Sequence, residues 1–224
     1  MGIFSLIRHE VNIVFERDPA ARSKAQVFFL YPGVRAIINY RIAHYLEKRG
    51  HHFIADWISK HTRRKTGIEI HPAAEIGKGV FIDHGMGVVI GETAVVGDYC
   101  TIYQGVTLGG TGKDKGKRHP TIGKNVTIGC GAKILGPFSV GDNSKIAANA
   151  VVLNEIPANS TCVGVPAHIV KRDNVRVAAA APLIHPIADL DQIHIPDPVS
   201  MEICRLNTEI DRLKKNLEEQ NNHD

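Results

Sequence analysis

Aliphatic residues recur at every sixth position through the middle of the chain. The spacing holds over three consecutive runs: Ile70, Ile76 and Ile82; Ile90, Val96, Ile102 and Leu108; and Ile122, Ile128, Ile134, Val140, Ile146 and Val152. A period of six matches neither the 3.6-residue period of a helix nor the two-residue period of a strand. It is the period of a stacked solenoid.

Each six-residue unit also carries a characteristic pattern of small residues. Glycine often follows the aliphatic position, as in Ile90-Gly91. A small or apolar residue stands four positions after the aliphatic one, as Ala94 does after Ile90. We interpret each unit as a short strand followed by a corner, with three units in one coil. Stacked coils pair each strand with the strands above and below, so sheet edges remain only at the two ends.

Two irregularities interrupt the repeat. The larger is the glycine-rich, charged stretch Gly109–Pro120. The smaller is a slip of two positions near Asp83-His84, because the aliphatic-glycine series resumes at Ile90 rather than at Val88. Val88 can still fill a core position, so this second signal is the softer one. The repeat itself specifies a fold, whereas a polar interruption of the repeat indicates a functional site.

Residues 1–66 have a helical pattern instead, beginning with apolar residues three or four apart at Ile3, Ile7, Val11 and Val14. Asp18-Pro19 predicts the start of a new helix, with Asp18 as N-cap and Pro19 at the first helical position. Pro32-Gly33 precedes another helix, which Gly50 is expected to end. A further helix contains Trp57. We expect these helices to cover one end of the solenoid.

The register of the repeat is lost after Val170. Prolines spaced from Pro186 to Pro198 predict an extended tail. A last apolar series spaced by three and four, at Ile203, Leu206, Ile210, Leu213 and Leu217, indicates a short helix, which either packs on its own subunit or forms a coil between subunits. The predicted organisation is a helical cap at 1–66, a β-helix at 67–170 and a tail at 171–224.

Composition indicates a globular protein: the 224 residues are 43% hydrophobic and carry a formal net charge of +4. The short basic run Lys60–Lys65 is interpreted as a helix end rather than a nucleic-acid patch, because no aromatic residues accompany clustered cations. No apolar run approaches the roughly 20 residues of a membrane span. Charged residues at Arg8 and Glu10 also argue against a signal peptide. We expect a cytoplasmic protein that binds neither nucleic acid nor membrane.

The four cysteines are widely spaced, at Cys100, Cys130, Cys162 and Cys204. Because no CxxC pair is present, neither a zinc site nor a disulfide framework is expected. Cys100 and Cys130 stand at positions of the repeat that suit a small apolar residue, and we interpret them as packing thiols.

The repeat resembles the left-handed parallel β-helix of the hexapeptide acyltransferases. The left hand is implied by this resemblance, because the general crossover rule favours the right hand. Within that superfamily the match is to the serine O-acetyltransferase family, on the strings GIEIHPAA (67–74), DHGMGVVIGETA (83–94), QGVTLGGTG (104–112) and KRHP (117–120). Arg17–Ala20 and Ile195–Val199 also fit that family, so the resemblance spans nearly the whole chain.

The resemblance implies transfer of the acetyl group of acetyl-CoA to the hydroxyl of L-serine, the first step of cysteine biosynthesis from serine. Acetyl-CoA is then a co-substrate, and no permanently bound cofactor or metal is expected. An alkanol hydroxyl is a poor nucleophile at neutral pH, so a base must take its proton. His84 is the candidate base, and the family pattern places Glu69 to orient it. Many members carry Asp there, and the alternative for Glu69 is a solvated corner charge.

Serine is zwitterionic and requires partners of both signs. Asp83 can bind the ammonium group, and Arg118 can hold the carboxylate in a bidentate fork that lysine cannot reproduce. His119 is a candidate hydrogen-bond donor. Asp18 is expected to reach the pocket from the helical cap, a role compatible with an N-cap. By family position Gly110, Cys130, Lys145 and Ala148 are candidates for binding CoA, with Lys145 near the phosphates or simply an exposed cation.

The expected assembly is a homotrimer or a dimer of trimers. The resemblance implies pockets between adjacent β-helices, with Gly109–Pro120 projecting over a neighbour. The family is often inhibited by L-cysteine, which could compete with serine at the same residues. It also often binds O-acetylserine sulfhydrylase through a C-terminal isoleucine. This chain ends at Asp224, so we do not expect that partner.

Three other functions are consistent with the fold alone. A related acetyltransferase acting on a sugar would not need the charges of Asp83 and Arg118. A β-helix used only for assembly would lack both the histidine and the polar interruption. A metal hydrase would need several histidines to converge, and the available ones are His71, His84 and His119.

Overall fold

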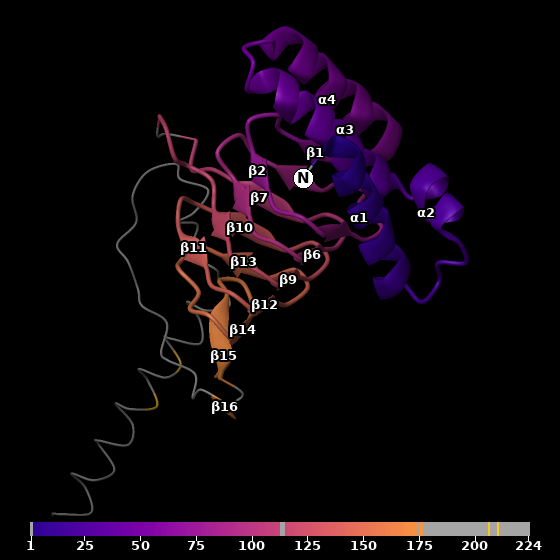
Figure 1. Ribbon diagram of the computed structural model, residues 1–224. Coiled ribbons are helices and arrows are strands. Elements are labelled where there is room, and N and C mark those ends of the chain that lie inside the picture. The colour runs from indigo at the N-terminus through magenta and orange to yellow at the C-terminus, as the bar shows by residue number, and fades with distance from the viewer. Residues whose placement is uncertain (1, 113–114, 174, 177–205, 207–209, 211–224) are drawn as a thin grey trace, which may run out of the picture. The chain divides into compact units, whose positions relative to one another are not determined.

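The computed structural model describes residues 2–112, 115–173, 175–176, 206 and 210. Four helices lie at one end of a stack of short strands, and residues 1–179 form one compact unit (Figure 1). The predicted tail lies almost entirely outside the described residues, as do Cys204 and most of the C-terminal helix predicted around Leu206 and Ile210.

The cap consists of α1 (Ile3–Arg17), α2 (Lys24–Leu30), α3 (Pro32–Glu47) and α4 (His52–Thr66). The prediction that Asp18 begins a helix is wrong: Asp18 is the C-cap of α1, and α2 begins six residues later with Ser23 as its N-cap. Pro32 is instead the proline at a helix start. The interpretation of Lys60–Lys65 as a helix end is confirmed, since three of its cations lie in the last turn of α4.

Successive strands of the solenoid enter three parallel sheets in turn. Sheet A contains β1 (Glu69–Ile70), β4 (Val89–Ile90), β7 (Thr107–Gly109), β10 (Lys133–Leu135) and β13 (Val151–Val152). Sheet B contains β2 (Glu75–Ile76), β5 (Val95–Val96), β8 (Thr121–Ile122) and β11 (Ser139–Val140). Sheet C contains β3 (Phe81–Ile82), β6 (Thr101–Ile102), β9 (Thr127–Ile128), β12 (Lys145–Ile146) and β14 (Ser160–Val163), extended antiparallel by β15 (His168–Arg172) and β16 (Val175–Arg176).

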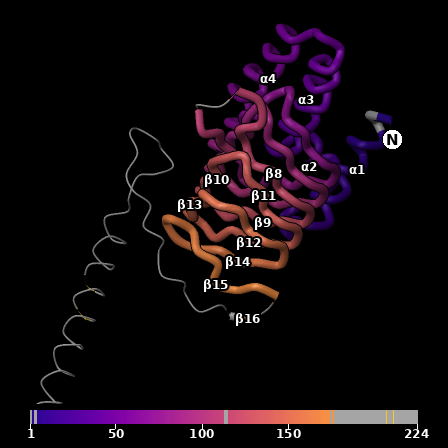
Figure 2. The backbone as a smooth tube through the Cα atoms, turned by 90° about the vertical axis from the view of Figure 1, so that its left-hand side faces the viewer, coloured from indigo at the N-terminus to yellow at the C-terminus, as the bar shows by residue number. Residues whose placement is uncertain are grey.

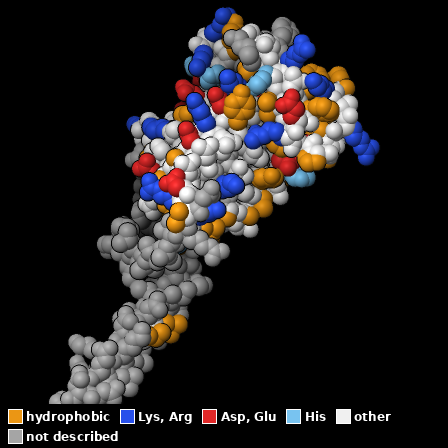
Figure 3. Space-filling model, turned by 60° about the horizontal axis from the view of Figure 1, so that its bottom comes forward, with side chains coloured by type: hydrophobic (Ala, Val, Ile, Leu, Met, Phe, Trp, Pro, Cys, Tyr) orange, Lys and Arg blue, Asp and Glu red, His pale blue; other side chains and the backbone are white. Residues whose placement is uncertain are grey.

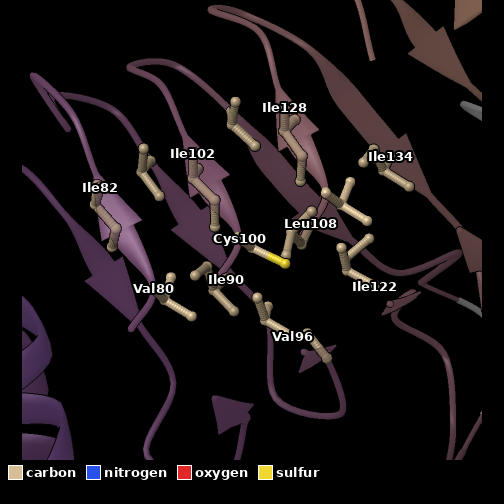
Figure 4. Packing of buried hydrophobic residues seen from close by; sticks show 14 of the residues in the cluster. Val80, Ile82, Ile90, Val96, Cys100, Ile102, Leu108, Ile122, Ile128 and Ile134 are labelled. Carbon is tan, nitrogen blue, oxygen red and sulfur yellow. The ribbon is translucent and has the colours of Figure 1, made fainter. Parts of the chain in front are cut away.

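The predicted six-residue repeat forms the core of this solenoid. Each aliphatic position pairs with its counterpart in the next coil, as Ile90 does with Leu108 and Leu108 with Ile134. Their side chains point into the coil and are buried (Figure 4). Val88 is fully buried as well, so it fills a core position beside the slip. Figure 2 shows the coils stacked along one axis.

The three cysteines among the described residues are free thiols. Cys100 and Cys162 are buried in the core, and burial raises the pKa of each thiol to about 11. Cys130 is half-buried at a corner. The prediction of packing thiols is confirmed for Cys100.

The cap is seated directly on the first coil. Gly33 of α3 lies so close to β3 that a Cβ there would come within 2.1 Å of the Ile82 carbonyl oxygen. Arg41 donates hydrogen bonds to the Ile76 and Gly77 carbonyls and pairs with the buried Glu10 of α1, at 2.9 Å. Because Glu10 also accepts the backbone N–H of Gly79, α1 and α3 are tied to the solenoid through polar contacts as well as packing.

Acidic and basic side chains are interspersed on the face of the molecule shown in Figure 3, rather than gathered into one basic patch. Over the described residues, no helix has both the length and the apolar character needed to cross a membrane.

Candidate active site

The two irregularities of the repeat lie on different edges of the three-sided solenoid. Asp83-His84 falls between β3 and β4, on the edge where sheet C passes into sheet A, here termed the C–A edge. Gly109–Pro120 falls between β7 and β8, on the edge where sheet A passes into sheet B, the A–B edge. Both edges border sheet A, so one face of the chain carries a candidate site residue along each side.

His84 stands in a tight turn of the C–A edge. Its backbone is left-handed, with φ of 57°, a conformation that costs energy in a residue with a Cβ. Two turn hydrogen bonds hold it there, from Gly85 N to the Asp83 carbonyl and from Met86 N to the His84 carbonyl. The imidazole is 77% exposed, and its Nε2 lies 3.9 Å from Asp83 Oδ1. The turn therefore presents an accessible imidazole beside a carboxylate.

Asp18 stands at the C-terminal end of α1. One carboxylate oxygen accepts the backbone N–H of Ala20 at 2.8 Å, and the other accepts the hydroxyl of Tyr31 at 2.7 Å. The hydrogen bond to Asp18 is the main reason that the pKa of Tyr31 rises to about 12, and the negative charge of Asp83 contributes in the same direction. The Tyr31 hydroxyl is thus bonded to Asp18 and lies within the electrostatic influence of Asp83. We call Asp18, Asp83 and His84 the acidic half-site.

Glu69 lies in the coil below this turn, where its backbone N–H donates to the Val88 carbonyl. Its carboxylate pairs with two cations of α4, Lys60 at 2.8 Å and Arg63 at 3.2 Å. Among the described residues, no hydrogen bond or ion pair joins Glu69 to His84. Both cations are more than half exposed, and such pairs contribute little to stability, so the carboxylate can change partners at small cost.

Thr93 organises the A–B edge. Its hydroxyl oxygen accepts the backbone N–H groups of Arg118, at 3.0 Å, and His119, at 3.1 Å. The end of the long insertion is thereby fastened to the corner of the coil below it. We call Arg118 and His119, with Glu92 and Thr93 beneath them, the basic half-site.

The tautomer of His119 follows from its contacts with Thr93. The backbone N–H of Thr93 donates to Nδ1 of His119 at 3.2 Å, and the Thr93 hydroxyl lies 2.9 Å from the same nitrogen. Nδ1 is therefore the acceptor, which leaves the proton on Nε2. Burial, reinforced by the nearby Arg118 cation, lowers the pKa of His119. The residue is thus a neutral imidazole that can donate one hydrogen bond, consistent with its predicted role.

Arg118 has an acidic partner that sequence reasoning did not identify. Its guanidinium donates to the carboxylate of Glu92, and both side chains are partly exposed, at 31% and 42%. Glu92 and Thr93 stand in the corner directly below the insertion, within one of the strings that resemble the acyltransferase family. The sequence signal that could have identified Glu92 is a pair of polar residues at a corner next to the interruption of the repeat. Tyr31, by contrast, left no signal in the sequence pattern.

The residues predicted to bind CoA divide between the two edges. Cys130 and Ala148 occupy successive coils of the C–A edge, where Asn149 N donates to the Cys130 carbonyl at 2.8 Å. Lys145 is exposed at the start of β12, which leads to that edge. Gly110 lies on the A–B edge, packed so closely that a Cβ would come within 3.0 Å of the Arg118 side chain.

The histidines considered for a metal site do not form one cluster. His84 lies on the C–A edge, whereas His71 and His119 lie on the A–B edge. Within the described part of the chain, no group of three or more His, Cys, Asp or Glu residues could hold a metal ion.

Comparisons with known proteins identify the family. Residues 119–154 match the model described as bacterial transferase hexapeptide (six repeats). The serine acetyltransferase of Staphylococcus xylosus is 50% identical over 208 residues, which is 93% of this chain and 92% of that protein. The chain belongs to the serine acetyltransferase family. The prediction of an acyltransferase of this family, drawn from the motifs, is confirmed.

Solved structures of serine acetyltransferases resemble the described fold. One is the Neisseria gonorrhoeae enzyme in complex with serine, with a TM-score of 0.73 and 41% identity, covering 75% of this chain and 69% of that one. Another is a serine acetyltransferase in complex with cysteine, with a TM-score of 0.74 and 44% identity, covering 76% of this chain and 66% of that one.

Proposed function

We propose that this chain transfers the acetyl group of acetyl-CoA to the hydroxyl of L-serine, producing O-acetyl-L-serine and CoA. Membership in the serine acetyltransferase family supports the reaction. The observation that carries the assignment to this chain's residues is the pair of half-sites of opposite charge. Carboxylates and an exposed imidazole lie on one edge, and a guanidinium and a neutral imidazole donor lie on the other.

His84 acts as the general base in this mechanism. It takes the proton of the serine hydroxyl as the oxygen attacks the carbonyl carbon of the thioester. The C–S bond then breaks, the acetyl group remains on serine, and the imidazolium returns its proton to the departing CoA sulfur. Asp83 binds the serine ammonium group with Asp18 beside it, while Arg118 and the Nε2–H of His119 bind the carboxylate.

The two half-sites require more than one chain. Because they lie along opposite sides of sheet A, a serine molecule cannot contact both within one solenoid. We therefore propose a ring of three chains, in which the C–A edge of one chain faces the A–B edge of the next. In this arrangement Gly109–Pro120 lies over the neighbour's His84. The proposal includes the left-handed winding that the family resemblance implies.

CoA is proposed to lie along the C–A edge, over the coils that follow His84. Two successive corners there carry a glycine whose backbone N–H bonds the preceding coil, from Gly105 N to Met86 O and from Gly131 N to Gln104 O, each 2.8 Å. The glycines at these corners leave the backbone accessible to the extended pantetheine arm. Cys130 and Ala148 continue this edge, and Lys145 is proposed to meet the phosphates.

Glu69 is proposed to orient His84. Its partners on α4 are exposed lysine and arginine side chains, so the carboxylate can turn to the imidazolium that forms during transfer. Orientation of His84 in this way requires the negative charge of the Glu69 carboxylate. Glu69→Gln removes that charge and therefore tests this role against a purely structural role of the side chain.

The test of the proposed function is CoA release from acetyl-CoA with a panel of hydroxylated acceptors. We expect release that depends on L-serine. Equal turnover with sugars would favour the alternative of a sugar acetyltransferase, and no turnover with any acceptor would favour an assembly module.

Arg118→Lys should raise the KM for serine by about tenfold, because lysine keeps the charge but loses the bidentate hydrogen bonds to the carboxylate. The KM for acetyl-CoA should stay within twofold. Steady-state kinetics with each substrate varied in turn measures both values, and Arg64→Lys on the exposed end of α4 is the matched control. Equal effects on the two substrates would remove Arg118 from the serine site.

L-Cysteine should inhibit in competition with serine. It carries the same ammonium and carboxylate groups, so the same charges can bind it, and a relative of this chain has been solved in complex with cysteine. Initial rates at several serine concentrations measure the pattern. Inhibition that saturating serine does not relieve would place the cysteine site elsewhere.

A further inference from the structure

Tyr31 contacts Asp18 of the acidic half-site, and none of the family motifs assigns it a role. It stands between two helices, as the C-cap of α2 and the residue before Pro32 of α3. Its backbone is fixed on both sides, since Tyr31 N donates to the Val27 carbonyl and Arg35 N donates to the Tyr31 carbonyl. The Cα of Tyr31 therefore has a fixed position relative to both helices.

The ring of Tyr31 packs against the small core of the cap. That core contains Val27 and Val34 and also Phe81, the residue of β3 that lies two positions before Asp83. The close seating of Gly33 on Ile82 holds the junction against the same strand. The hydroxyl is therefore positioned from the solenoid side as well as from the cap.

The hydroxyl completes the coordination of the Asp18 carboxylate. It donates to Oδ2 at 2.7 Å, while Oδ1 is held by Ala20 N at 2.8 Å. Both oxygens are thus fixed, yet each carboxylate oxygen has a further lone pair available for a ligand. A donor bound to a carboxylate in this way fixes its orientation without removing its charge.

We propose that Tyr31 is a positioning residue, which holds the Asp18 carboxylate toward Asp83 so that the two receive the ammonium group of serine. The inference rests on the proposed function, because it assigns a role to the carboxylates of that site. The pKa of Tyr31, raised to about 12, keeps the hydroxyl protonated as a donor throughout the neutral range.

The test is Tyr31→Phe, which keeps the packed ring and removes only the hydroxyl. We expect the KM for serine to rise about tenfold, the scale of one hydrogen bond to a charged group, with kcat and the KM for acetyl-CoA within twofold. Tyr45→Phe is the matched control, because Tyr45 is 51% exposed on α3, away from Asp18. Thermal unfolding of each variant checks that the cap remains folded.

A double-mutant cycle separates positioning from a structural role. In a chain that already carries Asp18→Asn, Tyr31→Phe should have no further effect on the KM for serine, because the carboxylate it orients is gone. Additive effects of the two changes would overturn the proposal, as would an equal rise in the KM for acetyl-CoA. If Tyr31→Phe is silent while Asp18→Asn raises the KM for serine, Tyr31 has no positioning role but the proposed function stands. If the unaltered chain does not acetylate serine, the proposed function itself fails.

Discussion

His84→Ala should lower kcat for serine acetylation by about 10²- to 10⁴-fold, the range that a positioned general base contributes. The KM for serine should change little, because the charges assigned to serine binding lie on Asp83, Asp18 and Arg118. Spectrophotometric detection of the CoA thiol measures both parameters. His52→Ala, at an exposed position of α4, is the control for removing an imidazole.

His84→Asn separates the loss of the general base from any change in the backbone conformation at residue 84. Residue 84 has a left-handed backbone, which asparagine tolerates better than alanine does, and asparagine cannot take a proton. We expect the same loss of kcat with unchanged thermal stability. Retention of more than about a tenth of the wild-type kcat in both variants would exclude His84 as the base.

Two inactive chains should restore activity when they assemble together. His84→Ala disables the acidic half-site and Arg118→Ala disables the basic one. In a ring of three that contains both chains, one interface pairs the intact half-site of each, so about a third of wild-type activity is expected. Co-expression with two affinity tags and sequential purification isolates the mixed rings.

The matched control pairs His84→Ala with Asp83→Asn. Both changes lie on the C–A edge, so no interface in a mixed ring has an intact acidic half-site, and activity should stay at the level of the parents. Mixed rings of His84→Ala and Arg118→Ala that are no more active than either parent would refute a site shared between neighbouring chains.

The solenoid could be predicted from the sequence because its core is a local repeat. Each buried aliphatic residue belongs to a six-residue unit, and the same unit recurs in every coil, so position along the chain determines position in the fold. The slip near Asp83 could also be predicted, because the aliphatic-glycine series resumes at Ile90. The extra residues form the turn between Ile82 and Val88. Corners of a regular coil are the only places where residues can be added without disturbing the stack.

The environment of Asp18 could not be predicted in this way. Asp18-Pro19 has the local chemistry of a helix start, but the carboxylate is satisfied by Tyr31, thirteen residues away. The carboxylate thus bonds a distant hydroxyl in addition to the nearby Ala20 N–H, and α2 begins only at Lys24. Glu92 likewise pairs with Arg118, twenty-six residues further along the chain and near the end of the inserted loop. Such pairs depend on how the loops return to the coil, which no period in the sequence encodes.

The direct seating of the cap on the first coil has a consequence for how serine is recognised. Two residues separate the end of α4 from β1, and Gly33, Arg41 and Glu10 join the cap to the coil without an intervening linker. We therefore expect the proposed acidic half-site to be preorganised, so that little conformational entropy is lost there when serine binds. Selection among amino acids then depends on the fit of fixed charges and not on closure of the cap around the substrate.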